Sequence, residues 1–178
     1  MLTEQDRRWL AAAARFARRG IPFSRPNPAV AALVVKHDRL IARGWTQPSG
    51  RPHAEAETLA AAGSAAAGAT IYVTLEPCAH ASPRGPACAD LLAASGAARV
   101  VIGCLDPDPR TTGKGIGRLR AAGIEVELAN CTACEASLAG YLTRTALRRP
   151  HITLKLALSA DARLAPPPGQ GQWLTGPI

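Results

Sequence analysis

Apolar and polar residues alternate along the chain in short blocks, and this pattern predicts helices and strands that follow one another. The first block predicts a helix over Glu4–Arg19. Thr3 and Asp6 resemble a capping arrangement at its start, and Gly20 ends it. The proline-rich stretch "IPFSRPNP" that follows predicts a loop.

The next blocks predict a sheet. "AVAALVVKHDRLIARGW" indicates two strands that turn near His37 and Asp38, which is an antiparallel hairpin. Short strands and helices then alternate, which indicates a sheet covered on both faces, and the hairpin makes that sheet mixed. We therefore predict an α/β fold, a three-layer α/β/α sandwich with a mixed central sheet. Its further elements are a helix at His53–Ala66, a strand at Thr70–Leu75, a helix at Cys88–Ser95, a strand at Arg99–Cys104, a helix at Gly115–Ala122, a strand at Ile124–Leu128 and a helix at Thr132–Leu147.

The pattern changes near residue 148. "HITLKLAL" predicts one more strand, and proline- and glycine-rich sequence follows it. One strand without partner elements cannot form a core. We therefore expect one domain at residues 1–147 and only the beginning of another at residues 148–178.

Composition and charge limit the kinds of partner. The net charge is +8, and arginine supplies nearly all of it, which suits either an anionic partner or a genome rich in arginine codons. The basic residues are scattered and aromatic residues are few, so we expect no nucleic-acid partner. No apolar run approaches the roughly 18 residues of a membrane span, and no export signal is indicated. We expect a cytoplasmic protein with no membrane partner.

Candidate chemistry centres on a histidine and two cysteines. The chain has five cysteines, and an odd count without an export signal favours thiols or metal ligands over disulfides. His53 at a helix start, Cys78 after a strand and Cys88 at a second helix start supply a His/Cys/Cys set. Catalytic zinc typically has three protein ligands and one open position. The sequence therefore predicts a zinc site at the rim of the sheet.

Glu55 lies two residues from His53 and is not needed as a ligand. Such a carboxylate can accept a proton from an activated water and pass it to a leaving amine. A single His-x-Glu, or a single buried cysteine, is more often structural, and the argument depends on the ordered set. "CTAC" at Cys131–Cys134 has no second pair to complete a metal site and indicates a structural role. "TGKG" suggests anion binding at a helix start.

"HAE" followed by "PC" resembles the signature of the zinc nucleobase deaminases, H-x-E…P-C-x-x-C, although nine residues separate the two cysteines here. With that long gap, the chain resembles the deaminase half of the bifunctional riboflavin-biosynthesis deaminase–reductase. The resemblance extends over nearly the whole sequence. It rests on "PNPAVAALVV", "GWTQPSGRPHAEAETL", "GATIYVTLEPCAH", "PACADLL", "ARVVIGCLDPDPRTTGKGIGRLRAAGIEVE" and "RPHITLKLALSADARLA".

The resemblance implies a cytidine-deaminase-like fold and a zinc-dependent hydrolase. The implied substrate is a small phosphorylated pyrimidine, 2,5-diamino-6-ribosylamino-4(3H)-pyrimidinone 5′-phosphate, which would lose its 2-amino group as ammonia. His53, Cys78 and Cys88 would be the zinc ligands, and Glu55 the proton donor and acceptor. The implied contacts to the ring, ribose or phosphate are Asn27, His80, Arg84, Asp106 and Asp108.

Those contact residues also have plainer interpretations. Asn27 between prolines suits a turn, Asp106 and Asp108 suit an ordinary loop, and Arg84 suits a solvated surface. The chain also departs from the family pattern. Thr46 stands where the family commonly has histidine, Asp108 replaces an asparagine, and the loop that holds Arg84 is one residue longer.

In the family a reductase domain that uses NADPH follows the deaminase. Residues 148–178 match only its beginning, so we expect NADPH chemistry only in a longer product and no reductase activity in this chain. The sequence is compatible with a homo-oligomer. Two other functions stay open: a related cytidine or nucleobase deaminase with another substrate, and a non-catalytic zinc-binding remnant.

Overall fold

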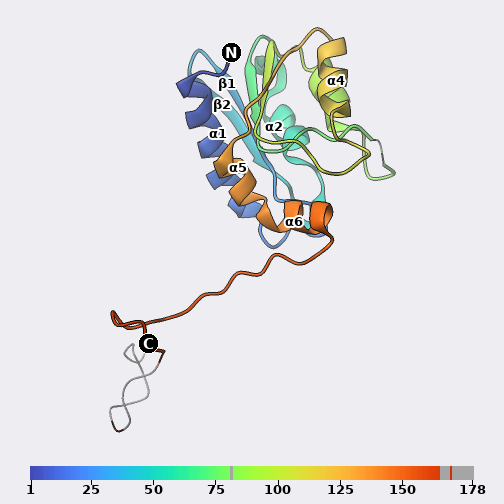
Figure 1. Ribbon diagram of the computed structural model, residues 1–178. Helices are drawn as coiled ribbons and strands as arrows, with labels where there is room; N and C mark the ends of the chain where they lie inside the picture. Colours follow the sequence, from blue (N-terminus) through green and yellow to red (C-terminus); the bar gives the residue numbers. More distant parts are fainter. Residues whose placement is uncertain (81, 165–168, 170–178) are drawn as a thin grey trace.

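A mixed five-stranded sheet lies at the centre of the computed structural model, which describes residues 1–80, 82–164 and 169 (Figure 1). The strand order is β2-β1-β3-β4-β5. β1 is antiparallel to both of its neighbours, whereas β3, β4 and β5 are parallel to one another. The predicted hairpin and mixed sheet are confirmed. The strands span Ala31–Lys36 (β1), Arg39–Trp45 (β2), Thr70–Val73 (β3), Arg99–Ile102 (β4) and Glu125–Leu128 (β5).

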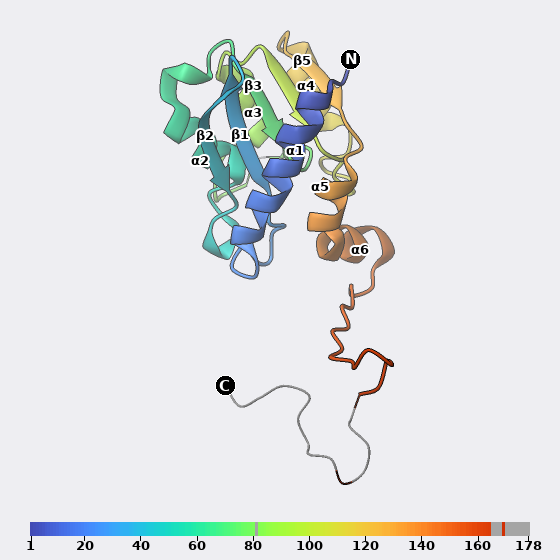
Figure 2. The same ribbon diagram turned by 90° about the vertical axis from the view of Figure 1, so that its left-hand side faces the viewer.

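Helices cover both faces of the sheet, as predicted. α1 and α5 lie side by side on one face, and α2, α3 and α4 lie on the other (Figures 1 and 2). α6 lies at the end of the domain beyond α5. The helices span Glu4–Ala17 (α1), Ala54–Ala62 (α2), Cys88–Ala94 (α3), Lys114–Ala121 (α4), Thr132–Ser137 (α5) and Ala139–Leu147 (α6), with short 3₁₀ turns at Arg18–Gly20, Pro48–Gly50 and Gly63–Ala66.

The interior strand β1 contributes to two layers of the core, because side chains alternate between the faces of a strand. Leu33 and Val35 pack toward α1, where they meet Leu10. Ala32 and Val34 pack toward α2 and α3 in a cluster that includes Leu92. Neither face of β1 meets water, which explains why its sequence is a continuous apolar run.

Helix α1 is anchored at its first turn by the predicted capping box. Thr3 accepts a hydrogen bond from the backbone N–H of Asp6, and the Asp6 carboxylate accepts one from the N–H of Thr3. The same carboxylate pairs with Arg99 and accepts a hydrogen bond from the Tyr72 hydroxyl. Because Arg99 and Tyr72 belong to β4 and β3, this buried group joins the helix to the sheet.

The prediction of a single helix over residues 132–147 is wrong, because two helices occupy this segment. It breaks at Leu138, whose φ of −106° and ψ of 6° lie outside the helical range. Leu138 is buried against the core, and the chain turns there so that α6 takes a new direction. This turn brings Tyr141 to Asp106, a contact that no local pattern reveals.

The strand predicted at "HITLKLAL" is not formed within the part of the chain that the structure describes. Within the described residues, 151–158 take part in no strand, and the chain there runs away from the domain (Figures 1 and 2). Ile152, Leu154, Leu156 and Leu158 are all exposed. Residues 151–158 thus pair with no described strand, and residues 165–168 and 170–178 of the predicted tail lie outside the described residues. None of the described helices has the length and apolar character needed to span a membrane.

Candidate metal centre and catalytic cavity

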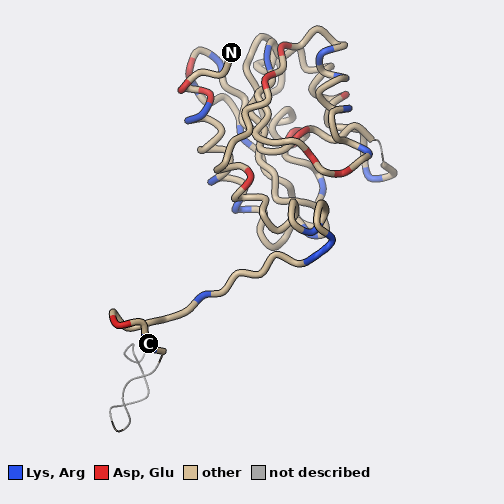
Figure 3. The backbone as a smooth tube through the Cα atoms, in the orientation of Figure 1, with Lys and Arg blue, Asp and Glu red and all other residues tan. Residues whose placement is uncertain are grey.

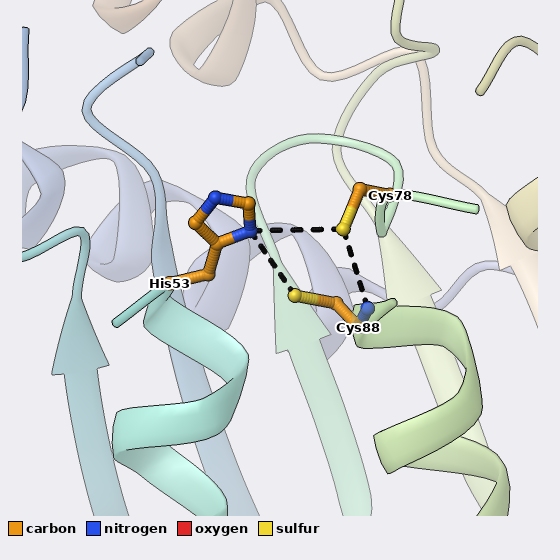
Figure 4. Close-up of side chains that lie close together, drawn as sticks. All are labelled: His53, Cys78 and Cys88. Carbon is orange, nitrogen blue, oxygen red and sulfur yellow. Dashed lines mark hydrogen bonds between the residues drawn. The ribbon is translucent and has the colours of Figure 1, made fainter. Parts of the chain in front are cut away.

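Three side chains from distant parts of the sequence point toward one another at the rim of the sheet (Figure 4). His53 is the N-cap residue of α2, and Cys88 is the first residue of α3. Cys78 lies in the loop that follows β3. The rim formed by the carboxyl ends of parallel strands is where α/β sheets place their binding sites, and this cluster lies there.

The geometry of the cluster fits a zinc ion. His53 Nδ1 lies 3.2 Å from Cys88 Sγ and 3.7 Å from Cys78 Sγ, and the three ligand atoms all lie within 4.8 Å of one another. Around a tetrahedral zinc with Zn–S of about 2.3 Å and Zn–N of about 2.0 Å, such atoms are about 3.5–3.8 Å apart. The soft thiolates and the imidazole also suit zinc chemically. The predicted ligand set is thus placed to bind the metal.

The two cysteines differ in their electrostatics. Cys78 Sγ accepts a hydrogen bond from the backbone N–H of Cys88 at 3.2 Å. The hydrogen bond from the Cys88 thiol lowers the pKa of Cys78 to about 4, with further help from His53, although burial opposes it. The same thiol–thiol contact and burial raise the pKa of Cys88. The thiol–thiol contact therefore favours one thiolate in the pair.

Glu55 is a buried carboxyl group in the first turn of α2, and only 4% of the residue is exposed. Burial raises its pKa, while the charge of His53 lowers it and that of Cys78 raises it. A carboxyl group with a raised pKa can hold a proton near neutral pH and release it again. Since it lines the same cavity as two of the ligands, Glu55 is placed for proton transfer there.

The cavity beside the cluster has a volume of about 230 Å³. His53, Cys78 and Glu55 are among the residues that line it. A larger hollow of about 750 Å³ lies between residues 21–29 and α6, but it contains none of these three groups. Among the predicted substrate contacts, the small cavity is lined by Asn27, His80, Asp106 and Asp108, whereas Arg84 is not part of its lining.

Asn27 contacts the histidine of the cluster, and His80 contacts the loop that precedes α4. The amide nitrogen of Asn27 donates to the Gly50 carbonyl at 2.9 Å and lies 2.9 Å from His53 Nε2, the ring nitrogen that faces away from the cysteines. Asn27 therefore orients the metal-ligand ring from behind. His80 Nδ1 lies 3.4 Å from the Thr111 hydroxyl.

Arg84 is an exposed residue whose guanidinium donates to the Ser49 carbonyl at 2.5 Å. This contact links the loop between the two cysteines to the 3₁₀ turn that precedes His53. The structure therefore does not bring Arg84 into the cavity with the other predicted contacts.

Asp106 and Asp108 belong to one loop and have different partners. Asp106 Oδ1 accepts hydrogen bonds from the Tyr141 hydroxyl at 2.6 Å and from the Asp108 N–H at 2.9 Å. Burial raises the pKa of Asp106. Asp108 instead forms an ion pair with Arg110, and the hydrogen bonds from that guanidinium lower the pKa of Asp108 to about 2. Asp108 is therefore an ionised carboxylate at the cavity wall, and the charge of Arg110 compensates its own.

Sequence reasoning missed Glu76, a buried carboxylate that accepts hydrogen bonds from the N–H groups of Gly113 at 3.1 Å and Ile116 at 3.2 Å. These amides are the start of α4, so the anion that "TGKG" attracts is a side chain of the protein itself. The position of Glu76 directly before Pro77 and Cys78 was the available signal. Arg110, Tyr141 and Arg144 also line the cavity and were missed.

Comparison with known proteins gives a consistent result. A family model described as the cytidine and deoxycytidylate deaminase zinc-binding region matches residues 3–104. The riboflavin biosynthesis protein RibD of Aquifex aeolicus is 42% identical over 98% of this chain, and RibD of Escherichia coli is 43% identical over 97%. Those matches cover 49% and 47% of the two proteins, so the chain spans about half the length of the curated relatives it matches.

Solved structures agree. RibD of Acinetobacter baumannii superposes with a TM-score of 0.80 at 43% identity, over 97% of this chain and 49% of that one. A diaminohydroxyphosphoribosylaminopyrimidine deaminase/5-amino-6-(5-phosphoribosylamino)uracil reductase of Thermotoga maritima superposes with a TM-score of 0.84 at 35% identity, over 97% and 50% of the two chains. In both comparisons the match covers about half of the solved chain.

Proposed function

The chain belongs to the cytidine and deoxycytidylate deaminase zinc-binding family, and from that premise we propose that it is the deaminase of riboflavin biosynthesis. The substrate would be 2,5-diamino-6-ribosylamino-4(3H)-pyrimidinone 5′-phosphate, and the products the corresponding uracil and ammonia. One observation carries the proposal: a His53, Cys78 and Cys88 cluster shares a cavity with the buried carboxyl group of Glu55. The names of the relatives support the choice of substrate.

Hydrolytic deamination forms one C–O bond, breaks one C–N bond and moves protons from water to the departing nitrogen. Zinc, when bound by His53, Cys78 and Cys88, would supply a Lewis acid that lowers the pKa of water to about 7. The Glu55 carboxylate would accept the proton of the water and deliver it to the amine, which then leaves as ammonia. Its raised pKa suits this double role, because the group must bind the proton and then give it up.

The remaining cavity residues would hold the ring. We propose that Asn27, His80 and Asp106 contact the pyrimidine or its ribose, since all three line the cavity. Asn27 would also keep the His53 ring in its orientation through the contact at Nε2. Arg84 is proposed only as a residue of the surrounding loops, because its guanidinium binds the Ser49 carbonyl.

We also propose that residues 1–147 form the deaminase domain and that residues 148–178 begin a reductase domain. The relatives are about twice as long as this chain, and the exposed apolar residues at 152–158 suit a strand that pairs elsewhere. NADPH would serve that second domain and not the zinc site.

A cytidine or deoxycytidylate deaminase is the second candidate, because the matching family includes such enzymes. Ammonia release from the diaminopyrimidine phosphate, measured beside cytidine and deoxycytidylate, separates the two. We expect turnover of the diaminopyrimidine alone. Turnover of cytidine or deoxycytidylate instead would favour the second candidate. A zinc-loaded protein that releases ammonia from none of the three would be a non-catalytic zinc-binding remnant.

A further inference from the structure

The catalytic cavity adjoins a shallow surface groove that is rich in arginine. We call this the arginine groove and define it by its four cations, Arg110, Arg144, Arg148 and Arg149. Asp108 is the single carboxylate among the residues that line it. The two spaces share the wall residues Asp108, Arg110, Arg144 and Thr145, so a molecule can extend from one into the other.

The two spaces differ in the charged groups that line them. Carboxyl groups of Glu55, Glu76 and Asp106 line the catalytic cavity, together with Cys78. The arginine groove has the four arginines, two of which follow α6 where the chain leaves the domain (Figure 3). A phosphate is attracted by the guanidinium groups of the groove. The charge pattern therefore favours an orientation in which the anionic end of a substrate lies in the arginine groove.

The two arginines that line both spaces are held in place and keep unused donors. Arg144 donates through Nη2 to the Pro26 carbonyl at 3.2 Å, and its guanidinium lies 5.9 Å from the centre of the Tyr141 ring. Arg110 donates through Nε and Nη2 to Asp108. An arginine has five N–H donors, so several on each side chain remain for a ligand. Guanidinium groups bind phosphate oxygens through paired hydrogen bonds.

The size of the cavity adds an independent argument. At about 230 Å³ it is smaller than the roughly 300–1,000 Å³ of sites that enclose a whole drug-sized ligand. A base with an attached sugar phosphate cannot fit inside it completely. Whatever part of such a molecule leaves the cavity past Arg110 or Arg144 enters the arginine groove.

We propose that the arginine groove binds the phosphate monoester of the substrate, with Arg110 and Arg144 as its principal ligands and Asp108 as the residue that positions Arg110. This inference rests on the proposed function, because it assigns the anionic end of that substrate. It also gives Asp108 a role other than substrate contact. An unpaired carboxylate in the groove would repel a phosphate, and the ion pair with Arg110 removes that repulsion.

The first test compares the phosphorylated substrate with the same ribosylaminopyrimidine without its phosphate. In Arg110→Gln and Arg144→Gln, KM for the phosphorylated compound should rise by about 10-fold to 100-fold, the usual effect of losing a hydrogen-bonded charge. KM for the dephosphorylated compound should stay unchanged. Arg7→Gln is the matched control, because Arg7 is exposed on α1 and lines neither space. An equal rise for both compounds would contradict phosphate binding in the groove.

A double-mutant cycle tests the role of Asp108. Arg110→Gln leaves the Asp108 charge uncompensated, whereas Arg110→Gln in an Asp108→Asn background does not. The rise in KM caused by Arg110→Gln should therefore be at least about 3-fold larger when Asp108 is present. Equal effects in the two backgrounds would contradict the positioning role of Asp108.

Binding of ribose 5-phosphate, followed by NMR or calorimetry on the zinc-loaded protein, separates the groove from the reaction. Wild type should bind it, and Arg110→Gln and Arg144→Gln should bind it at least about 10-fold more weakly. If wild type binds ribose 5-phosphate in this way but releases no ammonia from the diaminopyrimidine, phosphate binding in the groove is supported and the proposed function is wrong. If wild type turns over the diaminopyrimidine but the two variants bind ribose 5-phosphate as wild type does, the assignment of phosphate binding to the groove is wrong and the proposed function is supported.

Discussion

Gly115, in the first turn of α4, packs directly against the carbonyl of Pro77, the residue before Cys78. A Cβ at position 115 would overlap the Pro77 oxygen and lie 3.1 Å from Cγ of Glu76. The first turn of α4 is therefore packed in close contact with the backbone that precedes Cys78, a proposed zinc ligand. A side chain at Gly115 must displace either α4 or the Cys78 loop.

We predict that Gly115→Ala lowers the zinc content per chain and destabilises the protein by about 1–3 kcal/mol, as overpacking does. Gly117→Ala is the matched control, because no atom of the described residues lies within 4 Å of a Cβ there. Removing a glycine from that open helical position should stabilise the protein by about 0.5–1 kcal/mol. Zinc analysis and thermal unfolding check both variants, and full zinc occupancy in Gly115→Ala would contradict the coupling.

The second prediction concerns the proposed proton carrier. Glu55→Gln keeps the shape of the side chain and removes the group that accepts a proton. We expect turnover to fall by about 10²–10⁴-fold, the usual contribution of general acid–base catalysis, while zinc content stays at the wild-type level. Ammonia release and metal analysis of the same preparation provide the check. If this variant kept more than about a tenth of wild-type turnover, Glu55 would not be the proton carrier.

The third prediction concerns the metal ligands. Purified wild type should contain about one zinc per chain, and Cys78→Ser and Cys88→Ser should contain far less, because each loses one of three protein ligands. Cys131→Ser is the matched control. Cys131 caps α5 through its sulfur and belongs to no metal-ligand group of the described residues, and serine is a good N-cap residue. Equal zinc content in Cys78→Ser and Cys131→Ser would contradict the assignment.

Much of this architecture is readable from the sequence because it depends on local patterns. The apolar run at β1 and the capping box at Thr3 and Asp6 each act within a few residues, and both were predicted. The His53, Cys78 and Cys88 cluster was predicted because each ligand stands at the end of an element. Those ends meet at one rim of an α/β sheet, so the topology supplies the proximity.

Other features depend on contacts between distant residues and leave no local pattern. The break lies at Leu138, whose side chain packs into the core. The helix that follows the break places Tyr141 where its hydroxyl donates a hydrogen bond to Asp106. Likewise, the "TGKG" segment signals an anion at a helix start but cannot reveal that Glu76 supplies it. A strand pattern such as that at 151–158 also cannot show whether a sheet edge is within reach.

The last prediction concerns pH and the buried pair between Asp6 and Arg99. Only 2% of Asp6 is exposed, and its carboxylate binds Arg99 at 2.7 Å and Tyr72 at 2.8 Å. Burial alone would raise the pKa of Asp6, but the hydrogen bonds from Arg99, Thr3 and Tyr72 outweigh it and hold the pKa below its usual value. The folded state therefore binds this proton less readily than the unfolded state, in which the pKa is about 3.9.

The sign of the pH dependence follows from that difference. The stabilisation is fully present above about pH 4 and is lost as the pH falls from there toward the lower pKa of the folded state. At pH 7, Asp6→Asn should destabilise the protein by about 3 kcal/mol, the lower end of the cost of breaking a buried ion pair. The gap between wild type and variant should narrow below about pH 4. Denaturant unfolding at pH 7 and pH 3 measures both differences in the free energy of unfolding.

Asp90→Asn is the control, because its ion pair with Arg118 is exposed and should contribute less than about 1 kcal/mol at either pH. Since acid also weakens metal binding in every variant, the Asp90→Asn series reports that common loss. A gap for Asp6→Asn that stays constant from pH 7 to pH 3 would show that Asp6 does not contribute as a charged group.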